Sequence, residues 1–281
     1  MPPARRDTMT TIGVVGLGAM GGRIAGRLLS PDHGLYGTDQ ARSKAHTLIE
    51  QGLIWCDSPR EVAEASDIVF SMVPDSDALE AVTVGADGIL AGLTAGKVYV
   101  DMSTVSAQTS RELAKRVATR GASMLAAPVS GSVTAAEEAS LAIIVGGDAD
   151  AFERVEPILR RLGNTVTFVG DQGQALLLKL ATNIGLAAQA LAFSEGIQLA
   201  DHGGIDRDLA LEVLARSAIN SATLQARGLL ELPDEGWFNV QELLSAARVL
   251  GYEHHDIAAL FQVFSEILGA PAGREPEFRA A

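Results

Sequence analysis

The chain has 281 residues, 47% of them hydrophobic, so it can bury one large core or about two moderate ones, and disorder is excluded as its main state. Its 22 basic residues face 35 acidic ones, and the formal charge of −13 argues against a broad grip on nucleic acid phosphates. That charge favours work on small molecules instead. A single cysteine, Cys56, permits neither an internal disulfide nor a thiolate cluster, so a reducing cytoplasm is the expected location.

Short strand-like runs alternate with amphipathic segments after a loose tail at residues 1–8. The runs predict strands at residues 12–15, 35–38, 68–73, 98–101, 124–127, 141–145 and 166–169. Helical patterns between them include residues 21–29, 42–51 and 107–120. Since this alternation is typical of βαβ units, residues 9–170 are expected to form an α/β domain with a doubly wound, mainly parallel sheet.

No strand is expected after Gly170, where the pattern becomes helical. A first helix at residues 174–201 would be roughly 40 Å long, which is enough to join two domains. Shorter helices are predicted at residues 207–219, 222–231, 240–250 and 257–268, the last with Asp256 as its N-cap. We therefore expect a smaller all-α domain over residues 171–270 and a frayed tail at 271–281.

Neither a membrane span nor a metal site is expected. The most apolar long stretch, residues 175–193, contains Lys179, Asn183 and Gln189, which would be costly in lipid. Residues 253–256 (Glu-His-His-Asp) could suggest a metal cluster, but adjacent side chains in a turn rarely converge on one point. They predict a capped helix start instead.

A glycine-rich turn follows the first expected strand and opens the first expected helix. Its glycines permit a tight turn, a close approach of the backbone to a pyrophosphate, and close packing of the helix on the strand. In this context the turn predicts a dinucleotide site of the Rossmann type, and a purely structural turn is the alternative. The turn consists of Gly16, Leu17, Gly18, Ala19, Met20 and Gly21.

Asp39 directly follows the second expected strand. A carboxylate there would accept hydrogen bonds from the adenosine ribose hydroxyls and repel a 2′-phosphate, which favours NAD over NADP. Arg42 lies three residues further on and could soften that repulsion, so NADP stays open. The alternative is that Asp39 is a plain turn residue.

Four segments, in this order, resemble the β-hydroxyacid dehydrogenases, a family that includes the 3-hydroxyisobutyrate dehydrogenases and the tartronate semialdehyde reductases. The resemblance spans residues 12 to 206 and implies an NAD(P)-dependent oxidoreductase that interconverts a 3-hydroxy acid with its aldehyde or keto form. The segments are Gly16 to Gly21, Asp101-Met102-Ser103-Thr104, Ala127-Pro128-Val129-Ser130-Gly131, and Gly170-Asp171-Gln172-Gly173 leading to Lys179 and Asn183.

The same resemblance implies roles for individual residues. Lys179 would be the catalytic acid/base, and Asn183 would bind the substrate beside it. Ser103, Ser130 and Gly131, with the adjoining Ser132, would reach the substrate. Met72, Val73 and Pro74, together with Ser103, would line the cofactor.

The chemistry of these residue types agrees with the implied roles. A protonated amine near a carbonyl oxygen stabilises the negative charge that builds up during hydride transfer and then donates its proton. Asn183, one helical turn from Lys179, can hydrogen-bond a substrate without adding charge. Hydroxyls and amides of residues 130–132 would fit a substrate carboxylate. The alternatives are a surface-directed Lys179, with Asn183 capping a kink, and an ordinary turn at residues 130–132.

The chain departs from the family pattern at several points. Ala126 stands where the family usually has Asp, and Ser132 and Ala175 stand where it usually has Gly. No Lys-Asp pair follows Asn183, and the helical domain is expected to be roughly 30 residues shorter than usual. We expect that this leaves Leu186, Leu191 and Ile197 uncovered, which favours a homodimer.

Two other functions remain open from the sequence. One is an imine reductase of similar architecture, although such enzymes usually place Asp or Tyr where Lys179 stands. The other is a protein that binds the cofactor with little or no turnover, because the expected lysine of the lost helix is absent.

Overall fold

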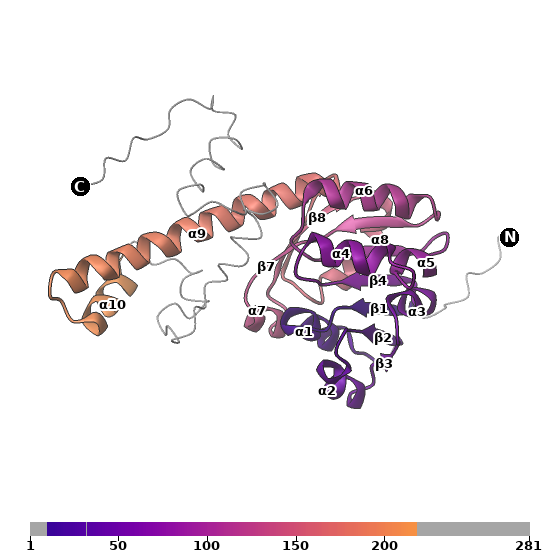
Figure 1. Cartoon of the computed structure of the whole chain (residues 1–281), viewed down its shortest axis with the longest axis horizontal. Helices are drawn as coiled ribbons and strands as arrows, with labels where there is room; N and C mark the ends of the chain where they lie inside the picture. The colour runs from indigo at the N-terminus through magenta and orange to yellow at the C-terminus, as the bar shows by residue number, and fades with distance from the viewer. Residues whose placement is uncertain (1–9, 32, 218–281) are drawn as a thin grey trace, which may run out of the picture. The chain divides into compact units, whose positions relative to one another are not determined.

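In the computed structural model, which describes residues 10–31 and 33–217, nine strands form one sheet in the order β3-β2-β1-β4-β5-β6-β8-β7, with β9 beside β8 (Figure 1). Neighbours from β3 to β6 are parallel, β8 runs antiparallel to both β6 and β7, and β9 is parallel to β8. The mainly parallel, doubly wound sheet is therefore confirmed. The strands are β1 Ile12–Val15, β2 Leu35–Thr38, β3 Ile54–Trp55, β4 Ile68–Ser71, β5 Val98–Asp101, β6 Ser123–Ala126, β7 Val129–Ser130, β8 Ala142–Gly147 and β9 Thr165–Gly170.

Helices occupy most of the connections between these strands. Many begin at a side chain that accepts hydrogen bonds from the first-turn amides, for example Asp75, Ser106 and Asp148. The helices are α1 Ala19–Leu28, the 3₁₀ turn η1 Arg42–Ala45, α2 His46–Glu50, α3 Pro59–Ala65, α4 Ser76–Val84, α5 Ile89–Gly92, α6 Ala107–Ala118, α7 Val133–Glu137, α8 Ala149–Leu159, α9 Gln172–His202 and α10 Arg207–Ala215.

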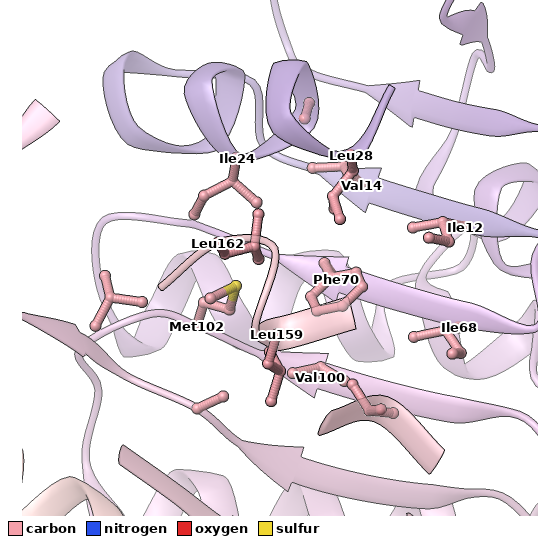
Figure 2. Close-up of a cluster of buried hydrophobic side chains, with 14 of the residues drawn as sticks. Ile12, Val14, Ile24, Leu28, Ile68, Phe70, Val100, Met102, Leu159 and Leu162 are labelled. Atoms are coloured by element: carbon pink, nitrogen blue, oxygen red, sulfur yellow. The ribbon is translucent and has the colours of Figure 1, made fainter. Parts of the chain in front are cut away.

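Each face of the sheet carries its own buried apolar layer, because successive strand residues point to opposite sides. On one face Val14, Phe70 and Val100 pack with α1 and α8, and Figure 2 shows Val14 beside Leu28 of α1 and Val100 beside Leu159 of α8. On the other face Val15, Val69 and Tyr99 pack with α3 to α6 and with the start of α9. Full burial of each such large apolar side chain contributes about 1.5–3 kcal/mol, so the two layers hold the strand ends in place.

The long helix α9 is attached to the sheet at its N-terminus. Asp171 and Gln174 form a capping box, and the Gln172 side chain donates to the Met124 carbonyl oxygen at 3.0 Å. Ala175 is fully buried against Gly146 of β8, which has no side chain to obstruct it. α10 then packs back on α9 (Figure 1). Lys179 thus lies two turns into a helix whose first turn is attached to the sheet.

Several predicted boundaries were wrong. β4 ends at Ser71 rather than at residue 73, since the Val73 amide donates to the Ser103 hydroxyl instead of to a neighbouring strand. α10 ends at Ala215 rather than at residue 219, where the chain tightens into bonds from the Arg216 and Ser217 amides to carbonyls three residues back. The two-residue strands β3 and β7 were missed because so short a run has no readable period.

All described residues belong to the unit Met1–Glu231, the other compact unit being Leu232–Ala281. The predicted helices at residues 222–231, 240–250 and 257–268, both tails, and residues 253–256 lie outside the described residues. Within the described part, no helix combines the length and apolarity needed to cross a membrane.

Candidate active site

The glycine turn has the geometry that a pyrophosphate site needs. Gly16 has φ +92, and a Cβ there would overlap the Met72 carbonyl oxygen, while a Cβ at Gly21 would overlap that of Gly16. Gly18 has no atom within 4 Å of its Cβ position and begins α1 without a side-chain cap. The side of Gly18 at the start of α1 is therefore open, which leaves room for an anionic group to approach the helix N-terminus.

Asp39 is bound to that turn. Its carboxylate accepts from the Leu17 amide at 2.8 Å and from the Ala41 amide at 3.0 Å, and the Lys44 ammonium lies 3.0 Å away. Burial raises the pKa of Asp39, but the two backbone hydrogen bonds and Lys44 outweigh that effect and lower it. The carboxylate is thus ionised at neutral pH and can serve as an acceptor for ribose hydroxyls.

Lys44, rather than Arg42, is the cation next to Asp39, and the sequence reasoning missed it. Arg42 lies over the Trp55 ring at 5.5 Å instead. The signal was present in the sequence, because the turn after β2 carries Asp39 and Lys44 five residues apart, but spacing alone does not show which cation turns back.

Ser103 joins the ends of two neighbouring strands. Its hydroxyl donates to Asp101 Oδ1 at 2.7 Å and accepts from the Val73 amide at 3.0 Å, and only 1% of the residue is exposed. Val73 in turn lies beside the Gly16 turn. The structure therefore brings the predicted cofactor residues 72–73 together with Ser103 and the glycine turn.

Residues 130–132 form a tight loop between β7 and α7. Ser130 pairs with Ala142 of β8, Gly131 has φ +147, and the Ser132 hydroxyl accepts from the Ala135 amide at 3.2 Å. α7 packs on α1, where Glu137 and Arg23 form an ion pair at 3.2 Å. The Ser132 hydroxyl is thus used as a helix cap, and the acidic Glu137 is tied to the helix that follows the glycine turn.

Lys179 and Asn183 form a buried polar pair on α9. Lys179 donates to Asn183 Oδ1 at 2.8 Å, and the residues are only 3% and 5% exposed. The alternative of a surface-directed lysine is therefore wrong. Asn183 Nδ2 is buried and has no hydrogen-bond partner within the described ranges, so a donor is held ready beside the ammonium. α9 also contacts β7, which carries Ser130.

The prediction that Leu186 and Ile197 are uncovered was wrong, since they are 8% and 4% exposed. Both side chains are therefore buried within this one chain, whereas the side chain of Leu191 lies outside the described residues. From α9 to the end of α10, the exposed large apolar side chains among the described residues are Leu177, Leu178, Leu199, Ile205, Leu209 and Val213.

The described part of the chain contains neither a reactive thiol nor a metal-binding cluster. Burial raises the pKa of the Cys56 thiol to about 11, with Glu61 and Asp57 adding to the effect, so the thiol stays protonated. Among residues 10–31 and 33–217, no three His, Cys, Asp or Glu residues lie close enough to hold a metal ion.

Comparison with known proteins identifies a family for the N-terminal part of the chain and relatives over most of its length. Residues 11–170 match the family described as the NAD binding domain of 6-phosphogluconate dehydrogenase. The Escherichia coli 2-hydroxy-3-oxopropionate reductase is 36% identical over 217 residues, or 77% of this chain and 74% of that protein. Glyoxylate/succinic semialdehyde reductase 2 of Arabidopsis thaliana, a chloroplast protein, is 32% identical over 80% of this chain, which spans 64% of that protein.

Solved structures show the same similarity. The Mycobacterium tuberculosis 3-hydroxyisobutyrate dehydrogenase with L-serine has a TM-score of 0.71 and 26% identity, over 95% of this chain and 89% of that one. An imine reductase from Pseudomonas sp. has a TM-score of 0.60 at 21% identity and shares the fold alone.

Proposed function

Since the chain belongs to the β-hydroxyacid dehydrogenase family, with its NAD-binding domain of the 6-phosphogluconate dehydrogenase type, we propose that it interconverts a 3-hydroxy acid and its aldehyde or keto form. It is an NAD(P)-dependent oxidoreductase, and the substrate proposed here is a small carboxylate similar to 3-hydroxyisobutyrate. The observation that carries the proposal is the buried Lys179–Asn183 pair, because an ammonium and an amide rarely share an apolar helix without a polar ligand.

Lys179 is the proposed acid/base. When bound, the cofactor supplies or accepts the hydride. During reduction the Lys179 ammonium would stabilise the charge growing on the carbonyl oxygen and donate a proton to it, and during oxidation the neutral amine would accept the alcohol proton. The Asn183 oxygen holds Lys179 Nζ at 2.8 Å, which leaves Asn183 Nδ2 to donate to the same substrate.

The substrate carboxylate is assigned to the loop at residues 130–132, which the backbone of Ser103 borders. Backbone amides of Gly131 and Ser132 suit a carboxylate, and Ser132 in place of the usual glycine still offers its amide. The cofactor is assigned to the turn Gly16 to Gly21, to Asp39 and to the segment Met72 to Pro74. This assignment divides the protein into a cofactor domain at residues 9–170 and a helical domain at 171–270.

NAD is the preferred cofactor in this proposal. The ionised Asp39 repels a 2′-phosphate, while Lys44, paired with it, weakens that repulsion without removing it. We expect an absorbance change at 340 nm with NAD⁺ and a panel of small 3-hydroxy acids, and a kcat/KM several-fold lower with NADP⁺. If both cofactors bind but no acid or aldehyde is turned over, the protein binds the cofactor without turnover and the proposed dehydrogenase activity is wrong. Turnover of cyclic imines alone would instead favour an imine reductase.

We also propose that the protein is cytoplasmic and forms a homodimer through α9 and α10. Leu199, Leu209 and Val213 are 76%, 53% and 58% exposed, and a second copy could cover them. Light scattering at micromolar concentration should give twice the mass of one chain, and Leu209→Glu should lower it. A wild-type mass of one chain would contradict this assembly.

A further inference from the structure

A chain of buried hydroxyl groups ends on Asp101, which belongs to the segment 101–104 but has no role predicted from the sequence. Asp101 and Ser71 are fully buried, and Asp101 Oδ1 accepts from the Ser71 hydroxyl at 2.7 Å. Behind Ser71 lie the Tyr99 hydroxyl at 2.9 Å and, beyond it, that of Thr83 at 3.1 Å. Since Ser71 gives its proton to Asp101, Tyr99 must donate to Ser71 and Thr83 to Tyr99. Each hydroxyl of the chain therefore donates to the next one, and the last of them donates to Asp101 Oδ1.

The same oxygen also holds Ser103. Asp101 Oδ1 accepts from the Ser103 hydroxyl at 2.7 Å and from its amide at 3.2 Å. Burial raises the pKa of Asp101, while the bonds from Ser103 and Ser71 act in the opposite direction. Asp101 Oδ2 is buried without a partner in the described part of the chain. Burying a carboxyl group with one oxygen unpaired is costly, so its position calls for a compensating role.

The Ser103 hydroxyl has no proton to offer a ligand. Its single proton goes to Asp101 Oδ1, and its oxygen accepts the Val73 amide at 3.0 Å. The residue is 1% exposed, so a substrate carboxylate cannot reach the hydroxyl without breaking both bonds. A carboxylate needs donors, and this hydroxyl already donates elsewhere.

The Val73 amide belongs to the segment that lies against the glycine turn. The Met72 carbonyl oxygen fills the place where Gly16 would carry a side chain, and Val73 is close to the same position. A shift of the Val73 amide would therefore move the Met72 carbonyl against Gly16, where the backbone already has φ +92.

We infer that Asp101 and Ser103 are positioning residues for the cofactor: through the Val73 amide they hold the segment Met72 to Pro74 against the glycine turn, and the Ser103 hydroxyl does not bind the substrate carboxylate. This inference rests on the proposed dinucleotide site. It refines the role of Ser103 there, leaving only its backbone to border the substrate.

Ser103→Ala tests the inference directly, because it removes the acceptor for Val73 and the donor to Asp101 together. NAD⁺ binding, measured by titration calorimetry without substrate, should weaken about tenfold, while the KM for the hydroxy acid at saturating NAD⁺ stays within about twofold. Ser110→Ala is the matched control, since the Ser110 hydroxyl is buried in α6 with no partner in the described residues. It should leave both constants unchanged.

Asp101 provides a second test. Asp101→Asn keeps an oxygen that can accept the bonds from Ser103 and Ser71, so NAD⁺ binding should stay within about threefold of wild type. Asp101→Ala should weaken binding as much as Ser103→Ala does, and if it does not fold, the Ser103 variant and Asp101→Asn still decide the question.

An unchanged NAD⁺ affinity in Ser103→Ala would overturn the inference, whether or not the KM for the acid rises. A raised KM would in addition show that the Ser103 hydroxyl binds the substrate. Failure of the proposed reaction is distinguishable, because the calorimetric constants need no turnover. A wild-type protein that binds neither NAD⁺ nor NADP⁺ would overturn the inference together with the cofactor site.

Discussion

Lys179→Met is expected to lower kcat at least about 100-fold, while NAD⁺ binding stays within about threefold of wild type. Methionine keeps the length and apolar stem of the lysine, so the 3% exposed position remains filled. What disappears is the proton donor and the positive charge beside the reacting oxygen. The measurement is steady-state turnover at 340 nm, combined with calorimetric titration of NAD⁺.

The control for this variant is Lys115→Met, which removes a lysine from the exposed face of α6 and should leave kcat unchanged. Wild-type turnover in Lys179→Met would remove the proposed acid/base role. Loss of NAD⁺ binding together with turnover would instead indicate that the lysine supports the cofactor site, and the assignment would also be wrong.

Gly18→Asp should strongly weaken cofactor binding without harming the fold. Gly18 has φ −67 and ψ −163, which any residue adopts, and a Cβ there meets nothing within 4 Å. It is the N-cap of α1, where Asp is preferred, so the melting temperature should be equal or higher. The new carboxylate would nevertheless stand where the pyrophosphate is expected and repel it, weakening NAD⁺ binding at least about 100-fold.

Gly185→Asp is the matched control for that variant. It adds the same charge at an exposed glycine with open space, on a side of α9 that differs from that of Asn183, and should leave NAD⁺ affinity unchanged. Gly16→Ala should behave differently, losing stability as well as binding, because the added Cβ overlaps the Met72 carbonyl oxygen. Wild-type NAD⁺ affinity in Gly18→Asp would place the pyrophosphate elsewhere.

The long elements could be predicted from the sequence, whereas the short ones could not. The short runs at residues 12–15, 35–38 and 98–101 predicted β1, β2 and β5 at their observed bounds, because the interior strands of a parallel sheet are buried on both faces and consist mostly of apolar residues. α9 begins earlier than predicted, at Gln172, since its capping box was not recognised in the Asp171 to Gln174 segment.

Some residues of the candidate site could likewise be predicted from the sequence, and others could not. The glycine turn, Asp39, Lys179 and Asn183 could be singled out because each depends on local spacing: a strand followed by a turn, or two residues one helical turn apart. The roles of Lys44 and Asp101 could not, since the first depends on how a flexible side chain turns and the second on a hydrogen bond from Ser71, thirty residues away in the chain.

The amino-acid order by itself determined the alternation of strands and helices, the glycine turn and the pairing of Lys179 with Asn183, since all of these follow from backbone periodicity and residue type over a few neighbouring positions. Only the tertiary structure decided that the Ser103 hydroxyl faces Asp101 and Val73, because β4 and β5 lie side by side in the sheet although about thirty residues separate Val73 from Ser103. Hydrogen bonds in a buried site are assigned by proximity in space, and a residue type that can serve two partners shows which one it serves only once the chain has folded.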